Sequence, residues 1–230
     1  MKPIYYPMFV SLRERVCLVI GGGSVGERKI RGLLRSQVTV RLVARDITPW
    51  LEARWKEGSI ALLGKNYQVS HLDGADLVFA ATSDPDLNRK IAADARSRGL
   101  WCNMATDPEM GSFIVPSVVE RGPLTIAVST AGLSPAVAKL IREKLEEEFG
   151  PEWTAYLELM GRLRAEIQSK GLDSTENQEL FRRISRLPLR EWMKSSQKNL
   201  ALGAIQEICE PWLSRDELSR FWDEIWKPFS

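Results

Sequence analysis

The chain has 230 residues, of which 44% are hydrophobic and 27% are charged, and its formal net charge at pH 7 is +2. These values are ordinary for a soluble globular protein and leave room for one large domain or two small ones with a real core. They do not suggest a nucleic-acid partner, because the charge is nearly balanced, or a membrane span, because no apolar run approaches ~20 residues.

The cysteines and the histidine restrict the chemistry further. Cys17, Cys102 and Cys209 are far apart and form no CxxC motif, so the sequence predicts neither a disulfide framework nor a zinc site. His71 is the only histidine, and one histidine cannot build a multi-histidine metal site. We therefore expect no resident metal. The first residues, MKPIYYPMFVSL, lack the long apolar core of a secretion signal, which favours a cytoplasmic protein.

A glycine motif near the N-terminus is the most informative feature of the chain. The apolar run 16–20 leads directly into Gly21-x-Gly23-x-x-Gly26, and a helical pattern follows. This is the order of a dinucleotide fingerprint: strand, tight turn, helix. A missing side chain at Gly23 lets a pyrophosphate approach the backbone, and the free N–H groups at the helix start then bind the anion. The alternative is a purely structural glycine turn.

The second half of the fingerprint leaves the cofactor open. The next apolar strand, predicted over 38–43, is followed by Ala44, Arg45 and Asp46. An acid at such a strand tip binds the ribose hydroxyls of NAD, whereas an arginine holds the 2′-phosphate of NADP. Because Arg45 and Asp46 are neighbours, spacing alone does not decide between the two cofactors. Both charges could also be solvated loop residues.

The first half of the chain alternates strand and helix signals, which predicts a parallel sheet with helices on both faces. Strands are expected over 16–20, 38–43, 60–63, 76–81 and 100–104, and helices over 25–35, 48–57 and 85–98. The carboxyl ends of parallel strands face the ligand crevice. We therefore expect residues 81–83 and 103–108 to lie beside the cofactor.

The pattern changes after the fifth strand. Two consecutive strands are predicted over 112–119 and 124–131, and Pro116 disfavours a central position for the first. A helix is predicted to begin after Ser134 and to end before Gly150. Further helices, and no strand, are expected over 152–169, 175–187, 197–209 and 214–226. The aromatic residues of this tail are expected to form its core, although the arginines among them also suit a lid over a flat anionic ligand.

Three segments in this order resemble the precorrin-2 dehydrogenase family of sirohaem biosynthesis. They read LRERVCLVIGGGSVGERKI, DLVFAATSDPDLN and WCNMATDPEMGSFIVPSVVERGPLTIAVSTAGLSPAVAKLIREKLE. The resemblance covers residues 3–150 strongly and the helical tail in position and character only. Residues 112–146 are its most specific part, because generic NAD domains lack a hairpin followed by this helix.

The resemblance implies an α/β fold and an activity. The expected parts are a Rossmann-type domain at 1–111, a small strand–helix dimerisation region at 112–150 and an all-α domain at 151–230. The implied reaction is NAD-dependent dehydrogenation of precorrin-2, an anionic tetrapyrrole, to sirohydrochlorin, carried out by a homodimer. The methyltransferase domain of the fused family members is expected to be absent. The alternatives are an enzyme that also inserts Fe²⁺ and a non-catalytic NAD-sensing module.

The fingerprint and the resemblance together give the expected binding residues. For the cofactor they are Gly21, Gly22, Gly23, Ser24, Val25, Gly26, Val43, Ala44, Arg45, Thr82 and Asn103. Ser129 matches a serine in the family's VS-[ST]-x-G loop and is expected at the substrate. A polycarboxylate substrate also needs cationic donors, for which arginine offers a planar fork. The expected donors are Arg182, Arg183 and Arg186.

One position departs from the family pattern. The family's acidic residue in Asn-x-x-Asp-x-Pro aligns with Thr106, and Asp107 follows one residue later. Threonine cannot act as a general base at neutral pH, so we expect Asp107 to be the catalytic carboxylate and Thr106 to contribute at most a hydrogen bond. The alternatives are a site that relies less on a base and an Asp107 that only starts the turn before Pro108.

Overall fold

The computed structural model describes residues 5–105 and 107–226. The chain forms two compact units. The first comprises Met1–Val115 and Ala131–Leu133, and the second comprises Pro116–Thr130 and Ser134–Ser230. Among the described residues, no helix is both long enough and apolar enough to span a membrane.

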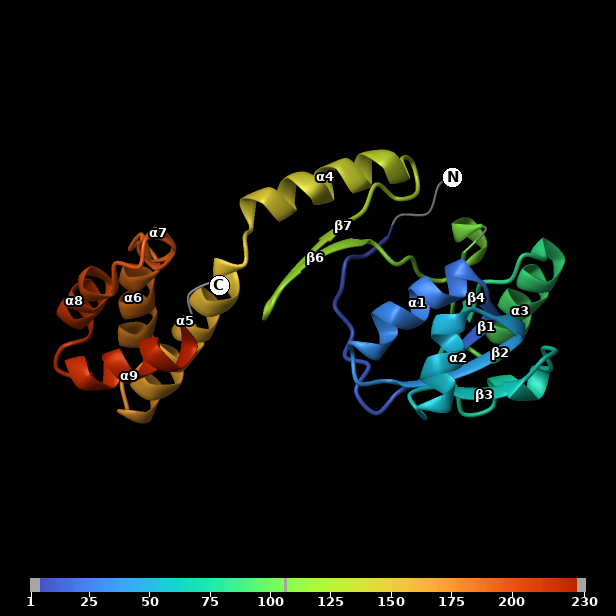
Figure 1. Cartoon of the computed structure of the whole chain (residues 1–230), viewed down its shortest axis with the longest axis horizontal. Coiled ribbons are helices and arrows are strands. Elements are labelled where there is room, and N and C mark those ends of the chain that lie inside the picture. The colour runs from blue at the N-terminus through green and yellow to red at the C-terminus, as the bar shows by residue number, and fades with distance from the viewer. Residues whose placement is uncertain (1–4, 106, 227–230) are drawn as a thin grey trace. The chain divides into compact units, whose positions relative to one another are not determined.

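The first unit contains a parallel sheet of five strands in the order β3-β2-β1-β4-β5 (Figure 1). The strands are β1 (Val16–Gly22), β2 (Thr39–Ile47), β3 (Ala61–Gly64), β4 (Leu77–Ala80) and β5 (Trp101–Met104). The helices are α1 (Ser24–Leu34), α2 (Pro49–Lys56) and α3 (Pro85–Ser97), with the short 3-10 helices η1 (Val69–Leu72) and η2 (Pro108–Met110). The Rossmann-type α/β sheet predicted from the sequence is confirmed.

The central strands are buried because helices cover both faces of the sheet. Val19 of β1 and Phe79 of β4 belong to one core layer, which also contains residues of α1 and α2. Leu18 of β1 and Val78 of β4 belong to the opposite layer, with residues of α3 and η1. A strand that is buried on both faces reads as a continuous apolar run, which is why the pattern of these strands was clear from the sequence.

The strand predicted over 112–119 is wrong over its first half, because β6 begins only at Ser117. Ser112 and Phe113, which precede β6, contact the sheet of the first unit instead. The Ser112 hydroxyl accepts a hydrogen bond from the backbone N–H of Cys102 at 2.7 Å, and the ring of Phe113 packs edge-on against Phe79 with 5.5 Å between the ring centroids. Pro116 then lacks the N–H that a strand ladder needs. The hairpin starts immediately after this residue.

The second unit begins with that hairpin, which pairs β6 (Ser117–Arg121) with β7 (Leu124–Val128) in antiparallel fashion. The helix α4 (Pro135–Glu148) follows, and the Ser134 hydroxyl caps it by accepting the backbone N–H of Val137 at 3.3 Å. At its other end, the Arg121 guanidinium donates to the carbonyl oxygens of Phe149 at 2.8 Å and Glu146 at 3.2 Å. These contacts tie the hairpin to the C-terminus of α4.

The remainder of the second unit is helical, as predicted. It contains α5 (Glu152–Ser169), α6 (Ser174–Ile184), α7 (Leu189–Lys194), α8 (Lys198–Cys209) and α9 (Arg215–Ile225). The helix α7 was not predicted from the sequence, because its 6 residues are too few to show a helical period. The core of these helices includes the buried Trp222, and Trp192, Trp212 and Trp226 pack against it. Most aromatic residues of the tail are therefore core residues.

Candidate functional site

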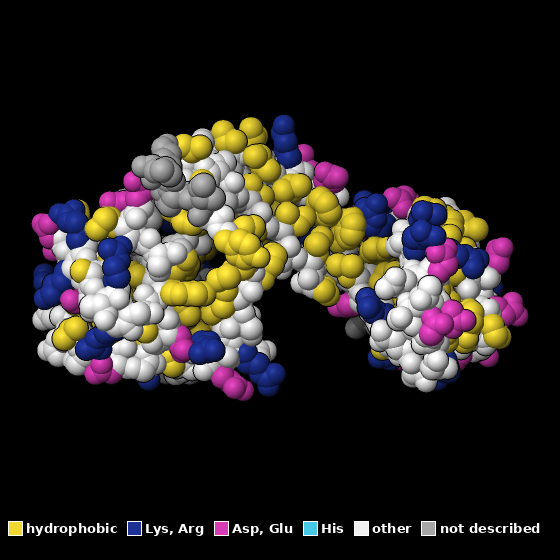
Figure 2. Space-filling model, turned by 180° about the vertical axis from the view of Figure 1, so that it is seen from behind, with side chains coloured by type: hydrophobic (Ala, Val, Ile, Leu, Met, Phe, Trp, Pro, Cys, Tyr) yellow, Lys and Arg dark blue, Asp and Glu magenta, His cyan; other side chains and the backbone are white. Residues whose placement is uncertain are grey.

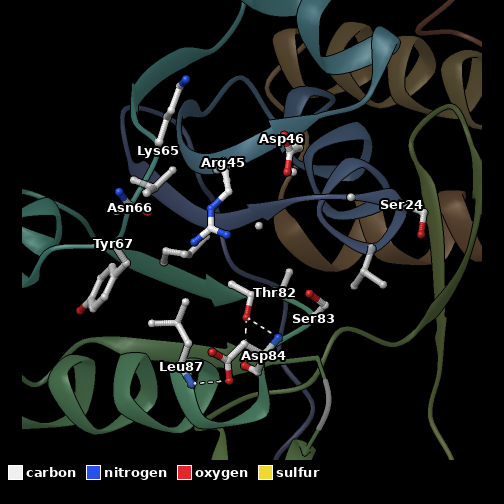
Figure 3. A pocket seen from close by; sticks show the side chains of 18 residues that line it. Ser24, Arg45, Asp46, Lys65, Asn66, Tyr67, Thr82, Ser83, Asp84 and Leu87 are labelled. Atoms are coloured by element: carbon white, nitrogen blue, oxygen red, sulfur yellow. Dashed lines mark hydrogen bonds between the residues drawn. The ribbon is translucent and has the colours of Figure 1, made fainter.

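A cavity of about 700 Å³ opens at the carboxyl ends of the central strands of the first unit (Figure 3). Four segments form it: the glycine turn after β1, the end of β2, the loop after β3 and the loop after β4. Its lining residues are Ile20, Gly21, Gly22, Gly23, Ser24, Val25, Val43, Ala44, Arg45, Asp46, Lys65, Asn66, Tyr67, Ala81, Thr82, Ser83, Asp84 and Leu87. Open parallel α/β sheets bind their ligands in this position.

Three glycines of the motif segment are required by the fold itself: two in the turn and one in the first turn of α1. A Cβ on Gly21 would lie 2.3 Å from the carbonyl oxygen of Ala81, and the φ of Gly21 is +115°. A Cβ on Gly22 would lie 2.4 Å from the carbonyl oxygen of Asp46, and one on Gly26 would lie 1.9 Å from that of Gly21. Any side chain at these positions would push β1, its neighbours and α1 apart.

Gly23 is different, because the fold does not explain it. Its φ is −79°, which any residue can adopt, and a Cβ there would meet nothing within 4 Å. The space above Gly23 belongs to the cavity, so a side chain at this position would intrude only on a ligand. This open cradle fits a group that must approach the backbone closely, such as a pyrophosphate.

The N-terminus of α1 supplies the electrostatics of the cradle. Gly23 is the N-cap and offers no side-chain cap, so the first N–H groups of the helix are available to a ligand. The one acidic residue of the first turn, Glu27, accepts hydrogen bonds from the Thr48 hydroxyl and from Arg31. Both bonds hold the pKa of Glu27 below its usual value. The helix dipole and the free donors therefore favour an anion at Gly23.

The loop after β4 forms one wall of the cavity and is held in place by hydrogen bonds to α3. The Thr82 hydroxyl donates to Oδ1 of the buried Asn88 at 2.8 Å, and Nδ2 of Asn88 donates back to the Thr82 carbonyl oxygen at 3.0 Å. The Asp84 carboxylate caps α3 by accepting the N–H groups of Asp86 and Leu87. Thr82 was predicted from the sequence as a cofactor residue, whereas Asn88 was not. The signal for Asn88 was a polar residue on the buried face of an otherwise amphipathic helix.

The opposite wall comes from the ends of β2 and β3. Val43 and Ala44 are buried there, whereas Arg45 and Asp46 are exposed on the cavity. The Tyr67 hydroxyl donates to Asp94 at 3.1 Å, which holds the ring in place. Burial, and then this carboxylate, raise the pKa of Tyr67 above its usual value. Residues 65–67 were absent from the predicted set, because no motif follows the short strand β3.

Two residues of the predicted cofactor set do not line the cavity. Gly26 lies at the contact between α1 and β1, as its packing shows. Asn103 is buried in β5, and its Nδ2 donates to the carbonyl oxygen of Phe113 at 3.0 Å. It therefore ties the last strand to the segment that leaves the sheet. The other predicted cofactor residues all line the cavity.

Asp107, Ser129 and the three predicted arginines are not among the residues that line the cavity. Thr106 lies outside the described residues. Asp107 is exposed, and its Oδ1 accepts the backbone N–H of Glu109 at 3.2 Å, a contact typical of a turn. Ser129 follows β7 and is exposed in the second unit. The three predicted arginines, Arg182, Arg183 and Arg186, lie on or just after α6 and are exposed. Arg182 forms an ion pair with Glu179.

The parallel sheet, the glycine turn and the open cradle at a helix N-terminus define a Rossmann-type nucleotide-binding protein. A family model described as "Putative NAD(P)-binding" matches residues 8–117, and one described as "Sirohaem biosynthesis protein central" matches residues 121–148. The cofactor class is therefore a nicotinamide dinucleotide.

Known proteins agree with these models. The chain is 34% identical over 210 residues to the sirohaem synthase of Citrobacter koseri, covering 91% of this chain and 45% of that protein. It is 38% identical over 166 residues to sirohaem synthase 1 of Serratia proteamaculans, covering 72% of this chain and 35% of that protein. The chain thus spans less than half the length of these curated relatives. It belongs to the sirohaem-biosynthesis family, as its motifs predicted.

A solved structure shares the whole fold. The precorrin-2 dehydrogenase SirC superposes with a TM-score of 0.72 and 23% sequence identity, covering 96% of this chain and 98% of that one. This likeness extends through both units and establishes the common architecture.

The cradle at Gly23 leads to a first prediction. The Gly23→Asp variant should fold normally, because the new Cβ meets nothing, yet it should lose nicotinamide dinucleotide binding, because a carboxylate would occupy the place of the pyrophosphate. Calorimetric titration with NAD⁺ and a thermal melt measure the two effects. Gly26→Ala is the contrasting variant and should lower the melting temperature. Undiminished NAD⁺ binding by Gly23→Asp would contradict the assignment of the cradle.

Proposed function

We propose that the protein is an NAD-dependent dehydrogenase that converts precorrin-2 to sirohydrochlorin in sirohaem biosynthesis. The observation that carries the proposal is the open cradle at Gly23, in a chain of the sirohaem-biosynthesis family that shares its full fold with a precorrin-2 dehydrogenase. NAD⁺ bound in the cavity supplies the hydride acceptor. The substrate loses one hydride and one proton, and the protein must bind, orient and deprotonate it.

NAD⁺ rather than NADP⁺ is proposed as the working cofactor. Asp46 lies at the end of β2 and lines the cavity, where a carboxylate can accept hydrogen bonds from the ribose hydroxyls. A 2′-phosphate at the same place would be repelled by this charge. The family resemblance also favours NAD⁺. Arg45 is the one residue of the strand end that opposes this preference.

Asp107 is proposed as the base that accepts the substrate proton. It follows β5 at the carboxyl edge of the sheet and is the only carboxylate between Asn103 and Pro108. One of its oxygens accepts the Glu109 N–H, and no other hydrogen bond of this carboxylate is found among the described residues. The second oxygen is therefore available to a substrate.

The carboxylates of the substrate are proposed to bind to arginines of the helical region. Arg183 and Arg186 are exposed, and the part of the chain that the structure describes contains no ion pair of either side chain. Arg182 already has Glu179 as a partner, so it contributes less. Arginine binds a carboxylate through two parallel hydrogen bonds, which gives both affinity and orientation.

Absorbance spectra test the proposed reaction against its alternatives. Anaerobic addition of NAD⁺ to the protein with precorrin-2 should produce sirohydrochlorin and an equal amount of NADH. Fe²⁺ is then added. A second spectral change that is faster than in a protein-free mixture would reveal an additional metal-inserting activity. NAD⁺ binding without any turnover would instead indicate a non-catalytic NAD-sensing module and would contradict the proposal.

Asp107 gives a second prediction. Asp107→Ala should lower kcat for NADH production by roughly 10²-fold or more, the usual effect of losing a general base, while NAD⁺ affinity stays within about twofold. Thr106→Ala is the neighbouring control and should cost less, since a hydroxyl carries no charge. A rate of Asp107→Ala that remains close to that of the parent protein would make this residue a turn former only.

A homodimer through α4 is the third prediction. Hydrophobic side chains gather over the stretch that carries the hairpin and α4 (Figure 2), and Val137, Leu140 and Ile141 of α4 remain 45%, 51% and 38% exposed. An apolar helix face of this kind needs a partner surface, and a second copy of the chain provides it with two-fold symmetry. Light scattering should therefore give about twice the chain mass of 26.0 kDa.

The matched pair Leu140→Glu and Leu200→Glu makes that measurement specific. The two leucines have nearly equal exposure, 51% and 52%, but Leu200 lies on α8 of the helical region. Only Leu140→Glu should shift the mass to that of one chain, because it buries a charge in the proposed interface. A monomeric parent protein, or equal behaviour of both variants, would refute the interface.

A further inference from the structure

The end of the cavity near β2 and β3 carries two cations that the proposed reaction does not use. β2 and β3 are parallel neighbours, and Val43 pairs with Gly64. This register brings Lys65, the residue after β3, beside the Ala44–Arg45 stretch of β2. Both Arg45 and Lys65 line the cavity. In Figure 3, the Arg45 side chain extends into the cavity, whereas Lys65 lies at the rim with its side chain pointing away from the Arg45 guanidinium.

Neither cation has a partner in the part of the chain that the structure describes. Within residues 5–105 and 107–226, the structure contains no ion pair or hydrogen bond of either side chain. Two other arginines of the same unit do have partners. Arg41, also on β2, donates to the carbonyl oxygen of Asp73 at 3.0 Å, and Arg54 pairs with Glu57 at 2.9 Å. Two cations on neighbouring strand ends of one cavity wall, with no partner among the described residues, are suited to an anionic ligand.

The position in the fold identifies the anion. In a sheet of this type, the end of the second strand faces the adenosine ribose of a bound dinucleotide. The anion that can occur there is a phosphate on the 2′ oxygen of that ribose. Arginine can bind such a phosphate through two parallel hydrogen bonds, and lysine adds a point charge.

We propose that Arg45 and Lys65 form a phosphate subsite at the adenosine end of the cavity, so that the protein binds NADP⁺ as well as NAD⁺. The inference rests on the proposed nicotinamide dinucleotide site and adds a second ligand to it. Asp46 is adjacent in sequence, but its side chain leaves the strand in another direction from that of Arg45 (Figure 3). The negative charge of Asp46 keeps NAD⁺ the tighter ligand, and the two cations reduce the difference in affinity between NAD⁺ and NADP⁺.

Two ligands that differ only at the 2′ position isolate this subsite. ADP-ribose and its 2′-phosphate both lack the nicotinamide, so calorimetric titration of the full-length protein with each measures the contribution of the phosphate directly. NAD⁺ and NADP⁺ are titrated in the same way. The measurement requires no precorrin-2, and a failure of the proposed dehydrogenation therefore leaves it unaffected.

The variants give the expected pattern. Arg45→Gln should lower the affinity for 2′-phospho-ADP-ribose and for NADP⁺ about tenfold or more, which is the loss expected for a charge-assisted hydrogen bond. The same variant should change the affinity for ADP-ribose and for NAD⁺ by less than about threefold. Lys65→Gln should act in the same direction but less. Asp46→Asn should tighten NADP⁺ relative to NAD⁺. Lys90→Gln removes an exposed cation of α3 outside the cavity and should leave the affinity for all four ligands unchanged.

Equal losses for the phosphorylated and unphosphorylated ligands in Arg45→Gln would overturn the subsite and leave the dinucleotide site intact. An unchanged affinity for the phosphorylated ligands in the Arg45→Gln, Lys65→Gln double variant would overturn it as well. Absence of binding by all four ligands to the parent protein would overturn both the subsite and the proposed function.

Discussion

The close approach of β1 and α1 is the constraint on which the site depends. The backbones meet so closely at Gly21 and Gly26 that a single Cβ at Gly26 would lie 1.9 Å from a carbonyl oxygen. This contact points the N-terminus of α1 into the cavity and fixes the turn between strand and helix. A Cβ on Gly23 would meet nothing within 4 Å, so this position is open to a ligand. The anion site is thus a consequence of backbone packing, and no cationic side chain is needed to create it.

The parallel sheet extends this single contact into a complete cavity. Because all its strands end at one edge, the ends of β2, β3 and β4 meet the glycine turn there. Each end contributes a different property: fixed hydrogen bonds at Thr82 and Asn88, charge at Arg45 and Asp46, and an anchored ring at Tyr67. The backbone cradle selects an anionic dinucleotide, and the charges at the strand ends determine the preference of the site between NAD⁺ and NADP⁺.

The sequence was sufficient for the features that depend on local pattern. The glycine spacing predicted the turn, the apolar runs predicted β1 and β4, and the Ser134–Pro135 pair predicted the start of α4. It failed where tertiary contacts decide the structure. The run at 112–116 reads as a strand, but Phe113 packs on the sheet of the first unit instead. Lys65 carries no motif, and only the register of β2 and β3 brings it to the cavity.

A titration that observes individual backbone amides tests whether the N-terminus of α1 binds the dinucleotide. NAD⁺ should shift the ¹⁵N–¹H resonances of Gly22, Gly23 and Ser24 most strongly, because the helix N–H groups bind the pyrophosphate. Smaller shifts are expected at Arg45 and Thr82. Ala165 and Gly203, in the middle of α5 and α8, provide the reference and should not move. Saturable shifts confined to other residues, with the glycine turn unchanged, would contradict the account.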